Sequence, residues 1–147
     1  MSRIRVSIFL IFLSLSIGHA QQKPLIDHFQ SDSIEVVLDG CECRLSNAKN
    51  AKGYVFISRV GGEDAWMSIA GATVHLEIVT SDESDSNRDI FTRNYKAPGL
   101  SVRVRMQRIT TPHDPNSESE GFQVKATITV QKGSQKQIIQ VFGLCGC

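Results

Sequence analysis

Two short cysteine pairs carry most of the chemistry that this sequence offers. They are Cys41-Glu42-Cys43 and Cys145-Gly146-Cys147, and the 147 residues contain no other cysteine. In an oxidising compartment an even number of cysteines predicts disulfide bonds. Four thiolates from two chelating pairs would instead suit zinc or copper(I), which favour sulfur ligands. A third hypothesis is a local redox-active disulfide between Cys145 and Cys147, beside the flexible Gly146.

Strand geometry favours structural disulfides at all four cysteines. Cysteines at positions i and i+2 of a strand project from the same face. If the two segments are antiparallel, Cys41 pairs with Cys147 and Cys43 with Cys145; a parallel register pairs Cys41 with Cys145 and Cys43 with Cys147. The first bridge closes a loop of about 100 residues, worth roughly 4 to 5 kcal/mol, and the second closes little more. Two thiolates on one zinc lie about 3.8 Å apart. Because i and i+2 lie roughly 6.5 to 7 Å apart on a strand, a metal site is the alternative only if both pairs kink.

The remaining residues give little support for catalysis. The histidines after residue 20 are His28, His75 and His113, and they share no metal-ligand spacing and accompany no glycine-framed serine. His75 and Glu77 fall on one face of a predicted strand, where they could form a general-base pair or ligate a metal. A solvent-facing strand pair is the preferred interpretation. We therefore predict no enzymatic activity and no cofactor.

A basic patch is the main candidate for binding. Arg103 and Arg105 share one face of a predicted strand, and Lys125 joins them if its strand is the neighbour. Arg93 would extend the patch. Such a surface would receive an acidic protein, a polyanionic glycan or an anionic lipid head group. Solvent-facing strand positions also need polar residues, and long basic side chains there guard against edge-to-edge pairing. The single tryptophan, Trp66, is a second candidate because it could stack on a sugar, although it could equally fill a core.

Residues 1–20 have the pattern of a secretory signal peptide. Arg3 and Arg5 precede an apolar run that ends at Gly18-His19-Ala20. The run is shorter than the roughly 20 apolar residues of a transmembrane helix, so no stable membrane span is expected after cleavage. Removing both arginines leaves fourteen basic residues against fifteen acidic ones, a net charge of −1. The protein as a whole therefore has no electrostatic field that would attract nucleic acid. Residues 21–147 are predicted to form one secreted or periplasmic domain.

Short alternating segments position these residues. The predicted strands are 34–39, 53–60, 66–69, 72–79, 90–95, 100–107, 122–130 and 137–142. Ala70-Gly71 is predicted to turn a tight hairpin. Polar segments 81–89 and 110–121 are predicted to be loops. A short helix is expected over 24–30, where Pro24 suits a first turn, and a helical turn within 46–52. The absence of a long helical period predicts an all-β fold: a single antiparallel β-sandwich or small β-barrel of about eight strands with a short N-terminal helix.

Together these features predict a disulfide-stapled β domain that acts as a non-enzymatic binding or inhibitory module. Its partner would be a protein or glycan bound through Arg103, Arg105, Lys125 or Trp66. The alternative function is metal handling by Cys41, Cys43, Cys145 and Cys147. No residue pattern matches a known family, so the sequence by itself does not specify the partner.

Overall fold

The computed structural model describes residues 24–30, 41–47, 53–59, 63–81, 89–109 and 121–146. In these residues the chain is all β, with no helix. The strands are β1 (Ile26–Asp27), β2 (Glu42–Ser46), β3 (Phe56–Arg59), β4 (Asp64–Ile69), β5 (Ala72–Ser81), β6 (Ile90–Ala97), β7 (Leu100–Ile109), β8 (Phe122–Lys132) and β9 (Gln135–Gly146). Among the described residues, no helix is long and apolar enough to cross a membrane.

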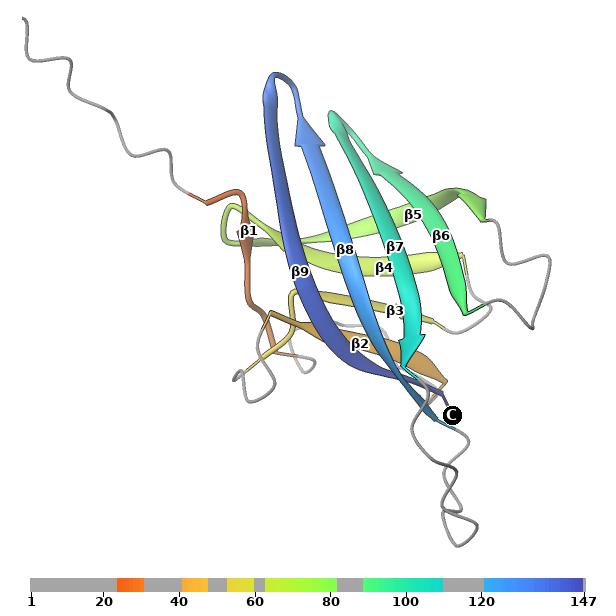
Figure 1. Cartoon of the computed structure of the whole chain (residues 1–147). Helices are drawn as coiled ribbons and strands as arrows, with labels where there is room; N and C mark the ends of the chain where they lie inside the picture. The colour runs from red at the N-terminus through yellow and green to blue at the C-terminus, as the bar shows by residue number, and fades with distance from the viewer. Residues whose placement is uncertain are drawn as a thin grey trace, which may run out of the picture.

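Strands β2 to β9 close into one antiparallel barrel (Figure 1). Each strand pairs with the next along the chain, and the barrel closes where β2 pairs antiparallel with β9. Strand β1 is an additional strand beside β4. The predicted all-β class is confirmed, and of the two predicted architectures the structure is the barrel. Closure removes the unpaired sheet edges that a sandwich would have to protect.

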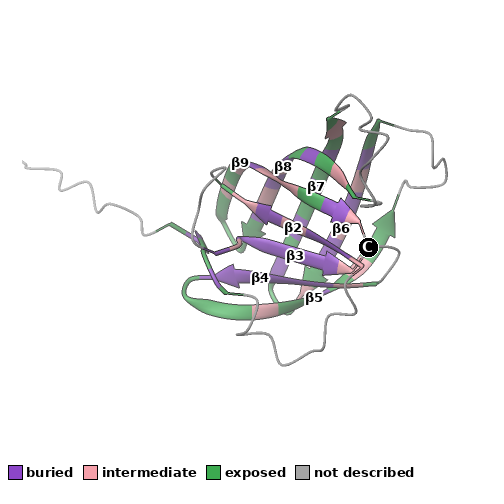
Figure 2. Cartoon of the chain, turned by 90° about the horizontal axis from the view of Figure 1, so that it is seen from below, coloured by how far each residue is buried: buried purple, intermediate pink, exposed green. Residues whose placement is uncertain are grey.

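The alternation of the sequence builds the barrel interior. Along β7 every second residue from Leu100 to Met106 is buried and the residues between are exposed, as the bands in Figure 2 show. Corresponding positions on β8 and β9 face the same interior. Phe56 and Tyr95 meet across it with ring centroids 5.5 Å apart. The described interior is therefore filled by side chains, most of them apolar, as in small barrels that hold no ligand.

The hairpin predicted at Ala70-Gly71 is confirmed. Ala70 has φ 53° and Gly71 has φ 86°, between strands that pair from Ile69 and Ala72 onward. Two successive positive φ values are the pattern of a type I′ turn, whose twist matches that of the flanking strands. The connection fixes the register of β4 and β5, and so decides which side chains share the outer face near His75.

The helix predicted over 24–30 is wrong. The segment is extended: Ile26 pairs with Ile69 of β4, and Phe29 forms a β-bridge with Tyr54. Backbone pairing with strand neighbours and burial of Leu25, Ile26 and Phe29 outweigh the weak helical signal of Pro24. The predicted helical turn within 46–52 lies largely outside the described residues.

Gln137 anchors this N-terminal segment to β9. Its Oε1 accepts hydrogen bonds from the backbone N–H groups of Leu25 and Ile26, at 2.7 and 3.0 Å. Gln137→Met keeps the length of the side chain but leaves both donors without that acceptor. We expect a loss of about 1 to 3 kcal/mol in the free energy of unfolding and faster amide exchange at Leu25 and Ile26. Gln137→Glu, which keeps the acceptor, should restore slow exchange. Unchanged exchange in Gln137→Met would contradict the anchoring role.

The other predicted strands agree with the structure except at one place. Strands β3 to β9 occupy the seven predicted segments from 53 onward. The exception is β2, which runs from Glu42 to Ser46, where the sequence pattern predicts no strand. The predicted strand 34–39, the predicted signal peptide 1–20 and most of both predicted loops lie outside the described residues.

Candidate binding surface

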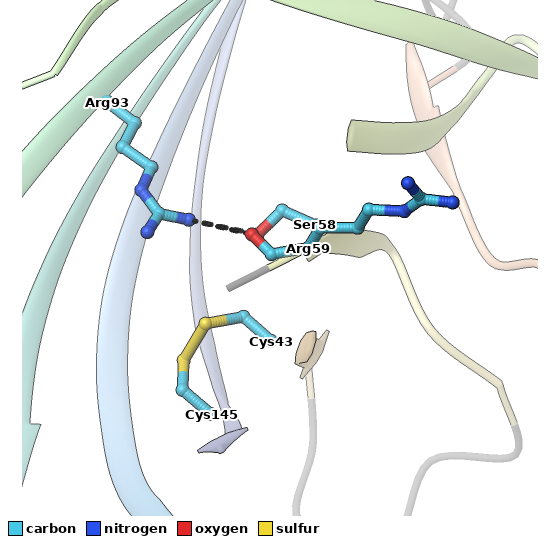
Figure 3. Close-up of a disulfide and its surroundings, with 5 residues drawn as sticks. All are labelled: Cys43, Ser58, Arg59, Arg93 and Cys145. Carbon is cyan, nitrogen blue, oxygen red and sulfur yellow. Dashed lines mark hydrogen bonds between the residues drawn. A yellow bond between two sulfur atoms is a disulfide. The ribbon is translucent and has the colours of Figure 1, made fainter. Parts of the chain in front are cut away.

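A disulfide joins the two ends of the barrel sheet. Cys43 of β2 and Cys145 of β9 stand directly opposite each other in antiparallel register and form a disulfide, with their Cα atoms 4.0 Å apart (Figure 3). Both residues are inside the barrel, 2 % and 1 % exposed. This is one of the two bridges of the predicted antiparallel pairing, and the predicted parallel pairing is wrong. An intramolecular disulfide is compatible with an oxidising compartment.

The bridge also bears on the metal and redox hypotheses. Because Cys43 and Cys145 are bonded to each other, neither has a thiolate to donate to a metal and Cys145 is not bonded to Cys147. Cys41 is not a free thiol, and its predicted partner Cys147 lies outside the described residues. No group of three or more potential metal-ligating residues occurs in the described part of the chain.

Arg93 lies inside the barrel, so the prediction that it extends the basic patch is wrong. It is 3 % exposed, and its guanidinium donates to Ser58 Oγ at 3.3 Å and to the Arg59 carbonyl at 3.4 Å (Figure 3). The reason is strand parity. Phe91 and Tyr95 point inward on β6, and Arg93 between them must do the same.

The predicted patch of Arg103, Arg105 and Lys125 is formed on the outside of the barrel. Strands β7 and β8 are neighbours, Arg105 is opposite Thr127, and Lys125 is opposite Gln107. Lys125 is therefore the diagonal neighbour of Arg105 on the same face, about 7 to 8 Å away. All three side chains are exposed. The sequence prediction required the strand of Lys125 to be the neighbour of the strand of Arg103 and Arg105. In the structure these two strands, β8 and β7, are neighbours.

The patch is part of a larger surface that carries no negative charge. Strands β6 to β9 lie side by side (Figure 1), and every residue in them is described. They contain eight basic residues and no aspartate or glutamate. We call their outward face the basic wall; its exposed cations are Lys96, Arg103, Arg105, Lys125 and Lys136. Lys96 and Lys136 were missed by sequence reasoning, which considered the net charge and the residues of a single predicted patch. The signal was present as two acid-free runs, 90–109 and 121–146.

The described acidic strand residues are on the opposite half of the barrel. They are Asp27 on β1, Glu42 on β2, Asp64 on β4 and Glu77 on β5. Arg44 on β2 is already neutralised, because it forms a salt bridge with the buried Glu42. Burial disfavours its charge, but hydrogen bonds to Tyr54 and Glu42 raise the pKa of Arg44 above its ordinary value. Arg44 therefore adds little to the field of the basic wall.

A shallow groove of about 390 Å³ borders the wall at β5 and β6. Its lining includes His75 and Glu77 on the outer face of β5, together with Lys96, Ala97 and Pro98. His75 Nε2 is 2.7 Å from Asp64 Oδ1, a partner that sequence reasoning did not identify. Both side chains are open to solvent, at 49 % and 39 % exposed. The pair could transfer a proton, but none of these lining residues carries a hydroxyl or thiol nucleophile.

Trp66 is not part of the basic wall. It lies on β4 and is 5 % exposed, packed with Phe29, Ile57 and Tyr54 in a small cluster on the outer side of the barrel. Its ring is 5.5 Å from that of His75. In this position the indole has no free face for a sugar. The structure brings together three of the four predicted binding residues and leaves Trp66 apart.

Comparison with protein-family models, with curated proteins and with solved structures finds no match for this chain.

Proposed function

We propose that the chain is a secreted or periplasmic β-barrel that binds an anionic ligand through its basic wall without transforming it. The observation that carries this proposal is the segregation of charge: the outward face of β6 to β9 exposes five basic residues, and these four strands contain no acidic one. Ordinary solubility does not require this, because surfaces are usually built with both signs interspersed. A one-signed wall attracts ligands of the opposite charge and raises their association rate.

The filled interior directs the proposal to the outside of the barrel. Eight-stranded barrels either hold a small ligand or fill the interior with side chains. Here most of the residues facing inward, among them Tyr95, Phe56 and Ile128, are almost wholly buried in one apolar cluster, and Arg93 and Ser58 are buried inside the barrel as well. No specific observation favours the metal-handling alternative, since Cys43 and Cys145 are joined to each other.

Arginine suits an anionic ligand at the centre of the wall. A guanidinium can donate two parallel hydrogen bonds to a carboxylate, sulfate or phosphate, whereas a lysine ammonium acts as a point charge. Arg103 and Arg105 stand two residues apart, each flanked across the strands by a threonine hydroxyl, Thr129 and Thr127. These neighbours supply neutral hydrogen-bonding groups beside the two cations.

Replacing Arg103, Arg105 and Lys125 by glutamine tests the proposal. We expect affinity for heparin, a sulfated polysaccharide, to fall about tenfold to hundredfold, equivalent to roughly 1 to 3 kcal/mol. Wild-type affinity should fall steeply with salt, and the slope of log affinity against log salt should be shallower in the variant. Calorimetry or surface plasmon resonance at several salt concentrations measures both.

Two controls separate charge from chemistry and from folding. Arg103→Lys with Arg105→Lys keeps the charge but loses the planar fork, so an intermediate affinity is expected. Glutamine already occupies neighbouring outward positions Gln107 and Gln123, so the triple variant should unfold at the wild-type denaturant midpoint. If wild-type protein fails to bind any polyanion at low salt, the proposed function is wrong.

A further inference from the structure

The cations of the basic wall form a line. The strand register orders four of them from one end of the wall to the other: Lys96, Arg103, Arg105, Lys125. Lys96 is opposite Ser101 on β7, so Arg103 is its diagonal neighbour; Arg105 follows on the same strand; Lys125 is diagonal to Arg105 on β8. Each step is about 7 Å, and the line is about 20 Å long. We call this line the cationic track.

We infer that the ligand is a linear anionic polysaccharide lying along the cationic track. This inference rests on the proposed function and specifies its ligand. A compact anion would be held by cations that converge on one point, and these four diverge along a line. A chain that carries an anionic group at regular intervals can contact all four in turn. Every track cation is exposed and belongs to a closed barrel, so the spacing is fixed before the ligand arrives.

The neutral residues around the track favour a glycan over a nucleic acid. Ser101, Gln107 and Thr129 stand beside the cations and can hydrogen-bond sugar hydroxyl groups. Single-stranded nucleic acids are bound by cationic grooves that also offer aromatic side chains for base stacking. On the wall the only outward aromatic residue is Phe142, beside Lys125 at one end of the track. The middle of the track has no stacking platform.

The two ends of the track differ in electrostatic surroundings. Lys96 is directly opposite Glu77 on β5, and the groove that it shares with Glu77 also contains His75, which contacts Asp64. These groups offset part of its charge. Lys125 is opposite the neutral Gln107 and Phe142. Lys96 is therefore expected to contribute least to binding and the two arginines most.

Lys136 provides a charge-matched control within the same wall. It lies on β9 opposite Gln131, separated from Lys96 by the two strands β7 and β8, and is not on the track. Removing Lys125 or Arg103 by glutamine substitution should weaken heparin binding about threefold to tenfold, whereas Lys136→Gln should change it less than about twofold.

Affinity for heparin oligosaccharides should rise with chain length until the ligand covers the track and then level off. The double variant Lys96→Gln and Lys125→Gln should weaken binding of the longer oligosaccharides more than binding of a disaccharide, which spans only part of the track.

The experiment separates failure of the track from failure of the proposed function. Equal losses for Lys136→Gln and Lys125→Gln, with binding retained in the wild type, overturn the track and leave a diffuse basic wall. Absence of heparin binding overturns both. Tighter binding of polyglutamate or of single-stranded DNA than of heparin at the same salt concentration overturns the polysaccharide as ligand. Track-dependent, length-dependent heparin binding supports the inference.

Discussion

A variant in which all four cysteines are alanine is expected to lose about 4 to 5 kcal/mol of unfolding free energy. Cys43 and Cys145 are 102 residues apart in sequence and lie at the pairing of β2 with β9, which closes the barrel. A cross-link over a loop of that length removes much of the freedom of the unfolded chain. For a domain of ordinary stability, a loss of about 4 to 5 kcal/mol is a large part of the total free energy of unfolding. Urea unfolding of the oxidised wild type and the variant measures the difference.

Pairwise replacement shows which bridge supplies the constraint. Should the predicted Cys41–Cys147 bridge also form, Cys43→Ala with Cys145→Ala leaves the long loop closed. That variant then loses only the packing of two buried sulfur atoms, about 1 to 2 kcal/mol. Wild-type protein reduced in denaturant should match the four-alanine variant, which itself should not respond to reductant. A four-alanine variant as stable as the oxidised wild type would contradict the stabilising role of the bridges.

Gly143→Ala is the second substitution with a large expected effect, because Gly143 lies at the same β2–β9 pairing. A Cβ added there would overlap the carbonyl oxygen of Arg44 and come within 2.9 Å of Leu45 Cδ2. The Arg44 oxygen belongs to the backbone of β2, so it cannot move without pulling β2 away from β9. We expect a loss of about 3 kcal/mol or more in unfolding free energy, measured by denaturant titration. Faster amide exchange should appear first in β2.

Gly121→Ala is the matched control for this substitution. A Cβ at Gly121 would be 3.4 Å from the Cys145 carbonyl oxygen and 3.9 Å from Leu144 Cδ2, which are ordinary contacts. Its effect should stay within about 0.5 kcal/mol, as for most surface substitutions. Gly143→Ala with a stability equal to that of Gly121→Ala would show that β2 and β9 can separate at this point without cost.

The cysteine substitutions and Gly143→Ala both act away from the side chains of the basic wall. Strand β9 forms one side of the wall, yet Gly143 and Cys145 face the interior and β2, and the track cations are on β6, β7 and β8. The folded fraction of each variant should therefore bind heparin with an affinity near that of the wild type. Binding and stability can in this way be measured as separate properties of the barrel.

The sequence by itself determined the local features of this protein. Alternation of apolar and polar residues located seven of the described strands, because side-chain direction repeats every two residues. The same parity placed Arg103 and Arg105 on one outer face. It also placed Arg93 between inward-facing Phe91 and Tyr95, and therefore inside the barrel. The positive-φ turn at Ala70-Gly71 follows from residues that are neighbours in the chain.

Only the tertiary structure decided how distant segments meet. Closure of β2 on β9, the antiparallel pairing of Cys43 with Cys145 and the extended course of residues 24–30 each depend on hydrogen bonds between residues far apart in sequence. The line from Lys96 to Lys125 likewise depends on the register of three strands. A local pattern fixes which face a side chain occupies, but register and closure are set by the packing of the whole interior and by turn geometry. For that reason the sequence indicated the basic residues, and the barrel arranged them into a track.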